Sequence, residues 1–68
     1  MTLGERLRKL RSEKNMTLRD VGEKLNISFS GLGEIERDER SCNTTTLEIL
    51  ANFYNVSTDY LLGKNDSN

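Results

Sequence analysis

The sequence contains no histidine and no proline, and Cys42 is its single cysteine. A lone cysteine cannot form an internal disulfide, and without histidine it cannot complete a structural zinc site. The thiol has no imidazole partner that could activate it as a nucleophile. The sequence also has no glycine-rich loop that could bind the phosphates of a nucleotide. We therefore expect no enzyme activity, no metal and no cofactor, and a fold held together by helix packing.

Long apolar runs are also missing. No stretch approaches the roughly 18 residues that span a bilayer, and no signal-peptide pattern opens the chain. With 68 residues the chain is one domain near the lower size limit for a self-supporting core. We expect a soluble, cytoplasmic protein with no membrane partner and no small-molecule site, because the apolar residues suffice for one core and leave none to line a pocket.

Charge is nearly balanced overall but is segregated along the chain. The formal net charge is −1, yet residues 1–14 carry five basic and two acidic side chains, whereas residues 34–39 carry four acidic side chains and one basic one. A net charge near zero argues against a nucleic-acid partner, for which a basic surface is usual. The distribution of charge on the folded surface therefore matters more than its sum.

Five polar residues each precede apolar positions at helical spacing, which predicts five helices. The predicted N-caps are Thr2, Thr17, Ser28, Asn43 (with Thr44 as the alternative) and Ser57. Thr2 with Glu5, and Thr17 with Asp20, have the spacing of capping boxes. The first helix should fade near Asn15, residues 38–42 read as a loop, and Gly63 ends the last helix. The domain is therefore predicted at residues 1–63, followed by a flexible tail at 64–68.

The apolar stripes of these helices predict one shared core. Its expected members are Leu3, Leu7, Leu10, Val21, Leu25, Leu32, Ile35, Leu47, Leu50, Ala51, Tyr54 and Leu61.

Residues 18–37 have the pattern of two short helices joined by a tight turn. Asn26 tolerates the left-handed conformation that such a turn needs. Gly22 is a small residue where the two helices would approach each other, although a glycine inside a helix can also be tolerated without any packing role. Leu32 and Ile35 would fix the second helix of the pair to the core and leave its other side exposed.

Three segments carry a resemblance to a known family: LRKLRSEKNMTLRDVGEKL, NISFSGLGEIER and TLEILANFYNVSTDYLLG. Together they resemble the phage-repressor and Cro-like helix-turn-helix regulators over about nine tenths of the chain. The resemblance implies an all-α, five-helix, lambda-repressor-like domain whose second and third helices form the DNA-reading unit, with the third in the major groove. It also implies a protein encoded by a bacterium or a phage and associated with the nucleoid.

The same resemblance implies the contact residues. The expected base contacts are Phe29, Ser30, Gly33 and Glu34. The expected phosphate contacts are Thr17, Arg19, Ser28, Arg40, Ser41 and Asn43. Glu36 is expected to pair with an arginine of the first helix, for which Arg11 is the best candidate.

Several positions depart from the usual family pattern. Phe29 stands where glutamine is common, and its ring can contact a thymine methyl or be partly buried against the end of the second helix. Glu34 can accept a hydrogen bond from cytosine N4 or else pair with Arg37. Leu18 removes a phosphate donor at the start of the second helix. Asp38 and Glu39 replace a glycine and a basic residue, so these changes are expected to lower DNA affinity.

Two functions fit this sequence. The first is a transcriptional regulator, most readily a repressor, that binds operator DNA as a homodimer through an apolar cluster of Tyr60, Leu61 and Leu62, unless those three only complete the core. The second is a protein-interaction module of the same fold, anti-repressor or antitoxin-like, with weakened DNA binding. The acidic segment 34–39 and the exposed apolar side chains Phe29 and Leu18 motivate the second.

Overall fold

Polar caps open all five helices of the computed structural model, which describes residues 1–64. Within that range the chain is all helical, as expected. The helices are α1 (Leu3–Glu13), α2 (Leu18–Leu25), α3 (Phe29–Glu36), α4 (Thr44–Tyr54) and α5 (Thr58–Leu61). None of the helices in this range is long and apolar enough to cross a membrane. Of the expected tail, residues 65–68 lie outside the described part of the chain.

The helix ends follow the predicted caps closely. Both capping boxes are present, with Thr2 and Glu5 at α1 and with Thr17 and Asp20 at α2. Asn43 and Ser57 also accept the expected backbone hydrogen bonds, and Gly63 has a positive φ of 79°. Ser28 is the N-cap of α3, but its hydroxyl makes no capping hydrogen bond.

The first helix ends near Asn15, as predicted. Its last residue is Glu13, and Lys14 is the C-cap, because Asn15 adopts the left-handed conformation with a φ of 56°. Asparagine tolerates that conformation better than most residues. The chain therefore turns toward α2 at Asn15.

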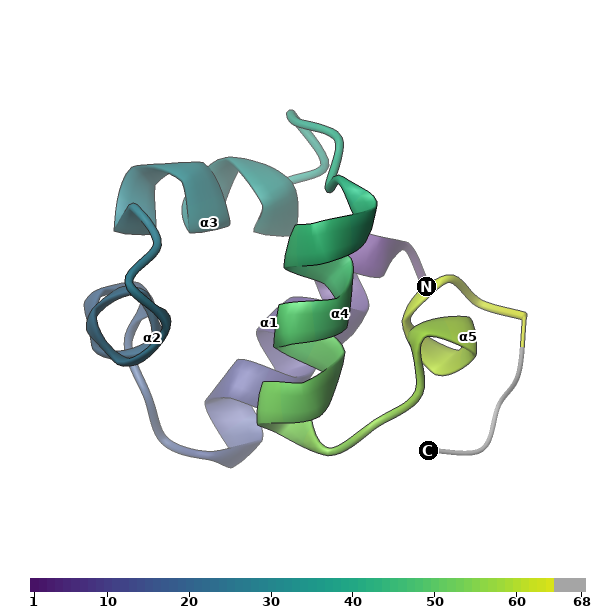
Figure 1. Cartoon of the computed structure of the whole chain (residues 1–68), viewed down its shortest axis with the longest axis horizontal. Helices are drawn as coiled ribbons and strands as arrows, with labels where there is room; N and C mark the ends of the chain where they lie inside the picture. The colour runs from purple at the N-terminus through teal and green to yellow at the C-terminus, as the bar shows by residue number, and fades with distance from the viewer. Residues whose placement is uncertain (65–68) are drawn as a thin grey trace.

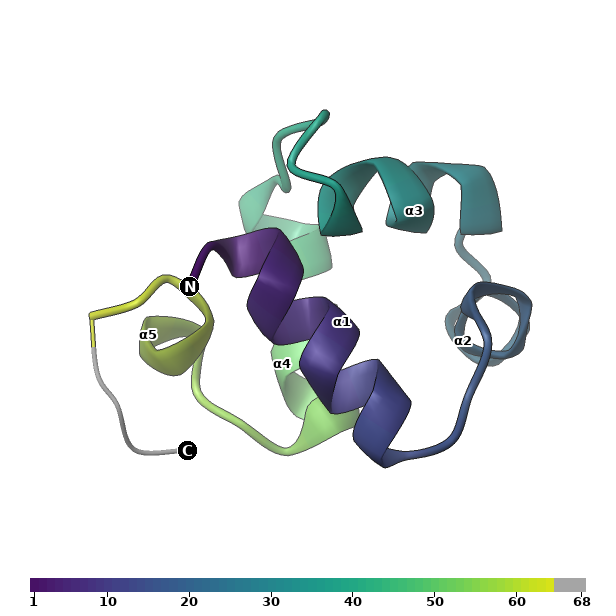
Figure 2. The same ribbon diagram turned by 180° about the vertical axis from the view of Figure 1, so that it is seen from behind.

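A single core joins the helices, and every one of its buried members was predicted. They are Leu7, Leu10, Val21, Leu32, Ile35, Leu47, Leu50, Ala51, Tyr54 and Leu61. Leu3 and Leu25, also predicted, are only partly buried against it. In both views of the ribbon α1 and α4 lie in the middle, with α2 and α3 on one side and α5 on the other (Figures 1 and 2). The helices α3 and α5 thus lie on opposite sides of the central pair.

The start of α1 packs directly on the end of α3. A Cβ atom at Gly4 would lie 2.7 Å from the carbonyl oxygen of Ile35 and closer still to that of Glu36, so only glycine allows this approach. Asp38 follows α3 in a left-handed conformation, and its carboxylate accepts hydrogen bonds from the Gly4 N–H (3.0 Å) and the Thr2 hydroxyl (2.6 Å). Asp38 therefore ties the end of α3 to the N-terminus of α1, where a negative charge is favourable.

The predicted pair of Arg11 and Glu36 forms a second tie between α1 and α3. Nε and Nη2 of Arg11 donate to the two carboxylate oxygens of Glu36 at 2.8 and 2.9 Å, and Nη1 donates to the carbonyl of Met16. The side chains are only 16% and 9% exposed. Hydrogen bonding to Glu36 raises the pKa of Arg11, and burial together with the charge of Glu36 raises the pKa of nearby Tyr54 to about 12.

Replacement of Arg11 by methionine tests this tie. The variant leaves the Glu36 carboxylate desolvated without its partner, so we expect a loss of about 3 kcal/mol in the free energy of unfolding measured with urea. The double variant Arg11→Met, Glu36→Met removes both charges and should recover most of that loss. A single variant as stable as the wild type would show that the pair does not hold α1 to α3.

Candidate nucleic-acid interface

The turn between α2 and α3 depends on two small or permissive residues. Asn26 has a φ of 56° and a ψ of 45°, and this left-handed conformation reverses the chain after α2. A Cβ atom at Gly22 would lie 2.7 Å from the carbonyl oxygen of Ile27 and 3.3 Å from the backbone nitrogen of Phe29. Gly22 therefore lets the turn and the start of α3 press against α2, which confirms the packing interpretation. In Figure 1, α2 is seen end-on while α3 runs across the view, so the two helices are steeply inclined.

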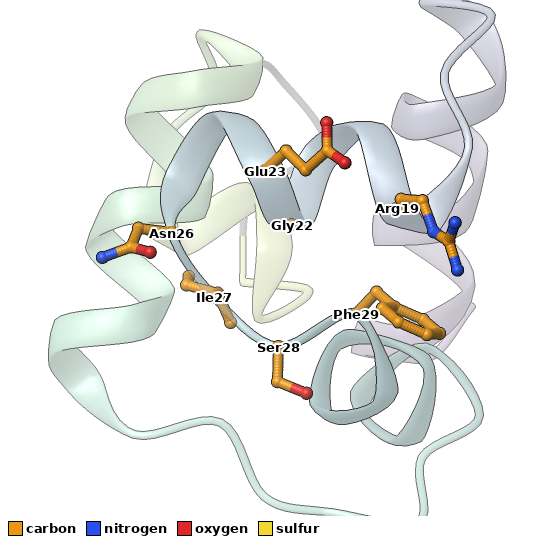
Figure 3. A pocket seen from close by; sticks show the side chains of 7 residues that line it. All are labelled: Arg19, Gly22, Glu23, Asn26, Ile27, Ser28 and Phe29. Carbon is orange, nitrogen blue, oxygen red and sulfur yellow. The ribbon is translucent and has the colours of Figure 1, made fainter.

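Phe29 lies at the mouth of this turn. Its side chain is 46% exposed, and the guanidinium of Arg19 is 5.2 Å from the centre of its ring. Both residues border a surface depression of about 420 Å³ (Figure 3). Its other lining residues are Gly22, Glu23, Asn26, Ile27 and Ser28. The aromatic ring thus lies at the surface, where it makes a cation–π contact with Arg19, and it is not buried in the core.

The predicted base-contacting residues of α3 differ in exposure. Phe29 and Ser30 are exposed, and the side chain of Glu34 is nearly half exposed. Gly33, however, is buried against Leu18 of α2 and covered by Arg37. Base contact by Gly33 would require the Arg37 side chain to move away, and it stays a prediction.

The acidic side chains after Gly33 find partners within the molecule. Arg40 pairs with Glu34 at 3.4 Å and Arg37 pairs with Glu39 at 3.2 Å. Glu36 is bound by Arg11, and Asp38 caps α1. The alternative pairing of Glu34 with Arg37 is therefore wrong, because Arg37 turns to Glu39. All four carboxylates of residues 34–39 therefore have intramolecular partners, and three of them pair with an arginine.

The residues expected at phosphate lie in two groups. Thr17 and Arg19 stand at the start of α2 and Ser28 at the start of α3, whereas Arg40, Ser41 and Asn43 surround the loop before α4. All six are exposed. The Thr17 hydroxyl and the Asn43 side-chain oxygen accept hydrogen bonds from the backbone N–H groups of Asp20 and Thr46. Their role as helix caps is established by these bonds, and phosphate contact by this group stays a prediction.

Comparison with known proteins supplies the family. A model described as Helix-turn-helix matches residues 7–61, which include α2, the turn and α3. The chain belongs to the helix-turn-helix family. It is 50% identical over 66 residues to the HTH-type transcriptional regulator ImmR of Bacillus subtilis, an alignment that covers 97% of this chain and 52% of ImmR. It is 34% identical over 64 residues to the immunity repressor protein of Bacillus phage phi105, covering 94% of this chain and 44% of the repressor.

Solved helix-turn-helix domains have the same architecture. The P22 c2 repressor in complex with a synthetic operator superposes with a TM-score of 0.88 at 28% identity, covering 96% of this chain and 98% of that one. The DNA-binding domain of BldD gives a TM-score of 0.78 at 33% identity, covering 90% and 89%. The five-helix, lambda-repressor-like fold is thereby confirmed. The chain spans about half the length of the two regulators named above.

The terminal helix of this helix-turn-helix domain divides the predicted dimer cluster. Leu61 is fully buried, with 0% exposure, and belongs to the core. Its predicted place in a dimer interface is therefore wrong, because no atom of it reaches the surface. Leu62 is 46% exposed, and Tyr60 is half-buried beneath the guanidinium of Arg6, 5.8 Å from the ring centre.

Two roles escaped the sequence analysis. Arg37, the C-cap residue of α3, covers Gly33 with its guanidinium, and the spacing of four residues would have indicated this contact. Asp38 was interpreted only as a departure that weakens DNA binding, whereas it caps α1.

Cys42 is half-buried, which raises the pKa of its thiol. No group of three potential metal ligands occurs among residues 1–64.

Alanine at Gly22 and at Gly31 gives a matched pair of variants in the two helices. At Gly22 the new Cβ would collide with the turn backbone, and we expect a loss of about 1–3 kcal/mol in the free energy of unfolding. At Gly31 the closest neighbour of the new Cβ, Nη1 of Arg40, is 3.5 Å away, so the better helix propensity of alanine should add up to about 1 kcal/mol. Thermal unfolding of both variants measures the difference. Equal effects at the two sites would contradict the close approach at Gly22.

Proposed function

We propose that the protein is a sequence-specific, double-stranded DNA-binding transcriptional regulator that represses by occupying an operator as a homodimer. The observation that carries the proposal is the exposed outer side of α3, held away from the core by Leu32 and Ile35 and flanked by α2. The P22 c2 repressor, whose structure was solved with its operator, shares this arrangement over almost the whole chain. ImmR and the phi105 immunity repressor are regulators by name.

The exposed residues of α3 suggest what the helix reads. Phe29 offers an apolar ring for a thymine methyl, Ser30 a hydroxyl for a base or a phosphate, and Glu34 an acceptor for the amino group of cytosine. The ion pair with Arg40 makes the Glu34 carboxylate less repulsive beside phosphates. The phosphate contacts proposed around these residues are Thr17, Arg19, Ser28, Arg40, Ser41 and Asn43.

The alternative function, a protein-interaction module that has lost DNA binding, has less support. It relied on a free acidic surface and on exposed apolar side chains at Phe29 and Leu18. The carboxylates of residues 34–39 are paired within the molecule, and Leu18 packs against Gly33. Phe29 alone remains exposed, and an aromatic ring at the start of α3 also suits DNA.

Affinity for duplex DNA should fall steeply with salt. We expect about four to six phosphate contacts per monomer, which corresponds to a log–log slope of about −0.9 for each contact. Fluorescence anisotropy with a labelled duplex, repeated at several potassium chloride concentrations, measures the slope. The variant Arg40→Ala should make the slope less steep by about 0.9 per monomer, the contribution of one phosphate contact. An affinity that does not change with salt would refute DNA binding by this surface.

Dimerisation is expected to depend on Leu62. A single domain reads only one half-site, so useful specificity needs two copies whose half-sites lie about 10 base pairs apart. Leu62→Asn should weaken self-association in sedimentation equilibrium, because it removes the most exposed apolar side chain of the terminal segment. Ile49→Asn on α4 is the control, since Ile49 is 37% exposed on another helix. A larger effect of the control would move the interface to α4.

A further inference from the structure

Gly33 leaves a gap on the side of α3 that borders α2, next to the exposed residue Ser30. Gly33 follows Ser30 by three residues and precedes Arg37 by four, so the three positions share one side of the helix. Gly33 has no side chain, and its backbone is buried. A surface that reads bases would therefore lack a side chain beside Ser30 unless another residue fills that place.

Arg37 fills it. A Cβ atom at Gly33 would lie 3.0 Å from Nη1 of Arg37 and 3.8 Å from Cζ, so the guanidinium occupies the space where a side chain at position 33 would begin. Side chains on a helix point back toward its N-terminus, and Arg37, the C-cap residue, reaches one turn back along α3 in this way. Leu18 of α2 borders the same space, with its Cδ1 atom 3.3 Å from that Cβ position.

The guanidinium is also oriented from its other side. Nε of Arg37 pairs with Glu39 at 3.2 Å, while the side chain is 57% exposed. This ion pair engages Nε and leaves the edge formed by Nη1 and Nη2 for another acceptor. Arg8 of α1 borders the same shallow surface, which adds positive charge beside it. A planar fork of two donors on the outer side of a reading helix matches the O6 and N7 acceptors that guanine presents in the major groove.

We propose that Arg37, laid over Gly33, is a specificity-determining residue that reads a guanine in each half-site. This inference depends on the proposed DNA-binding function, and it adds a residue and a base that the sequence analysis did not assign. Gly33 then acts as a positioning residue: the missing side chain gives the Arg37 guanidinium its place.

Selection from a random duplex library tests the proposal without a known operator. The wild-type chain should enrich half-sites that contain a fixed guanine. Arg37→Ala should lose the preference at that position by about 5- to 150-fold, the range of one bidentate base contact, and keep the preferences at the others. Arg37→Lys keeps the charge but not the fork, and should lose most of the same preference.

Two further variants separate position from charge. Gly33→Ala changes no charge but displaces the flexible end of Arg37, so it should weaken the preference for the same guanine. Lys9→Ala removes one exposed positive charge from α1 and should leave every base preference unchanged.

The outcomes distinguish this inference from the proposed function. If the wild type enriches a sequence but Arg37→Ala only weakens binding equally to all sequences, Arg37 contacts phosphate and the inference is wrong while the proposed function stands. The same conclusion follows if the preferences of Arg37→Ala and Gly33→Ala equal those of the wild type. Failure of the wild type to enrich any sequence would overturn the proposed function and the inference together.

Discussion

The contact between α1 and α3 is the constraint on which the reading surface depends. Gly4 allows the two backbones to meet, Asp38 caps α1 from the residue that follows α3, and Arg11 binds Glu36 where both side chains are largely removed from water. These ties join both ends of α1 to the last turn of α3 or to Asp38 just beyond it. A buried ion pair adds little net stability compared with apolar packing, but once formed it strongly disfavours arrangements that separate its members. It therefore fixes the direction of α3.

This constraint also explains how a chain with a net charge of −1 can present a surface for DNA. The carboxylates of residues 34–39 are used in holding α3 to α1 or in pairing with Arg37 and Arg40. The exposed pairs are weak, because solvent screens them, and their arginines can exchange a carboxylate for a phosphate at small cost. Local pairing, and not the sum of charges, decides what this surface attracts.

Much of the fold could be predicted because its signals are local. Thr2, Thr17 and Asn43 cap helices through bonds to residues three positions away, and apolar spacing alone identified every buried core residue. The errors arose where tertiary contacts decide. Leu61 faces inward because of what packs against it, and Asp38 finds its partner 34 residues away. The path of the Arg37 side chain, likewise, follows from the space left by Gly33 and not from its own position.

The most direct test is an NMR titration of the chain with a duplex that it binds. If α1 holds α3 outward to read DNA, amide shifts should concentrate at Phe29, Ser30 and the first turn of α2, while the core residues next to Arg11 and Glu36 stay unchanged. Shifts centred instead on the exposed side of α4, around Ile49 and Asn52, would contradict the account.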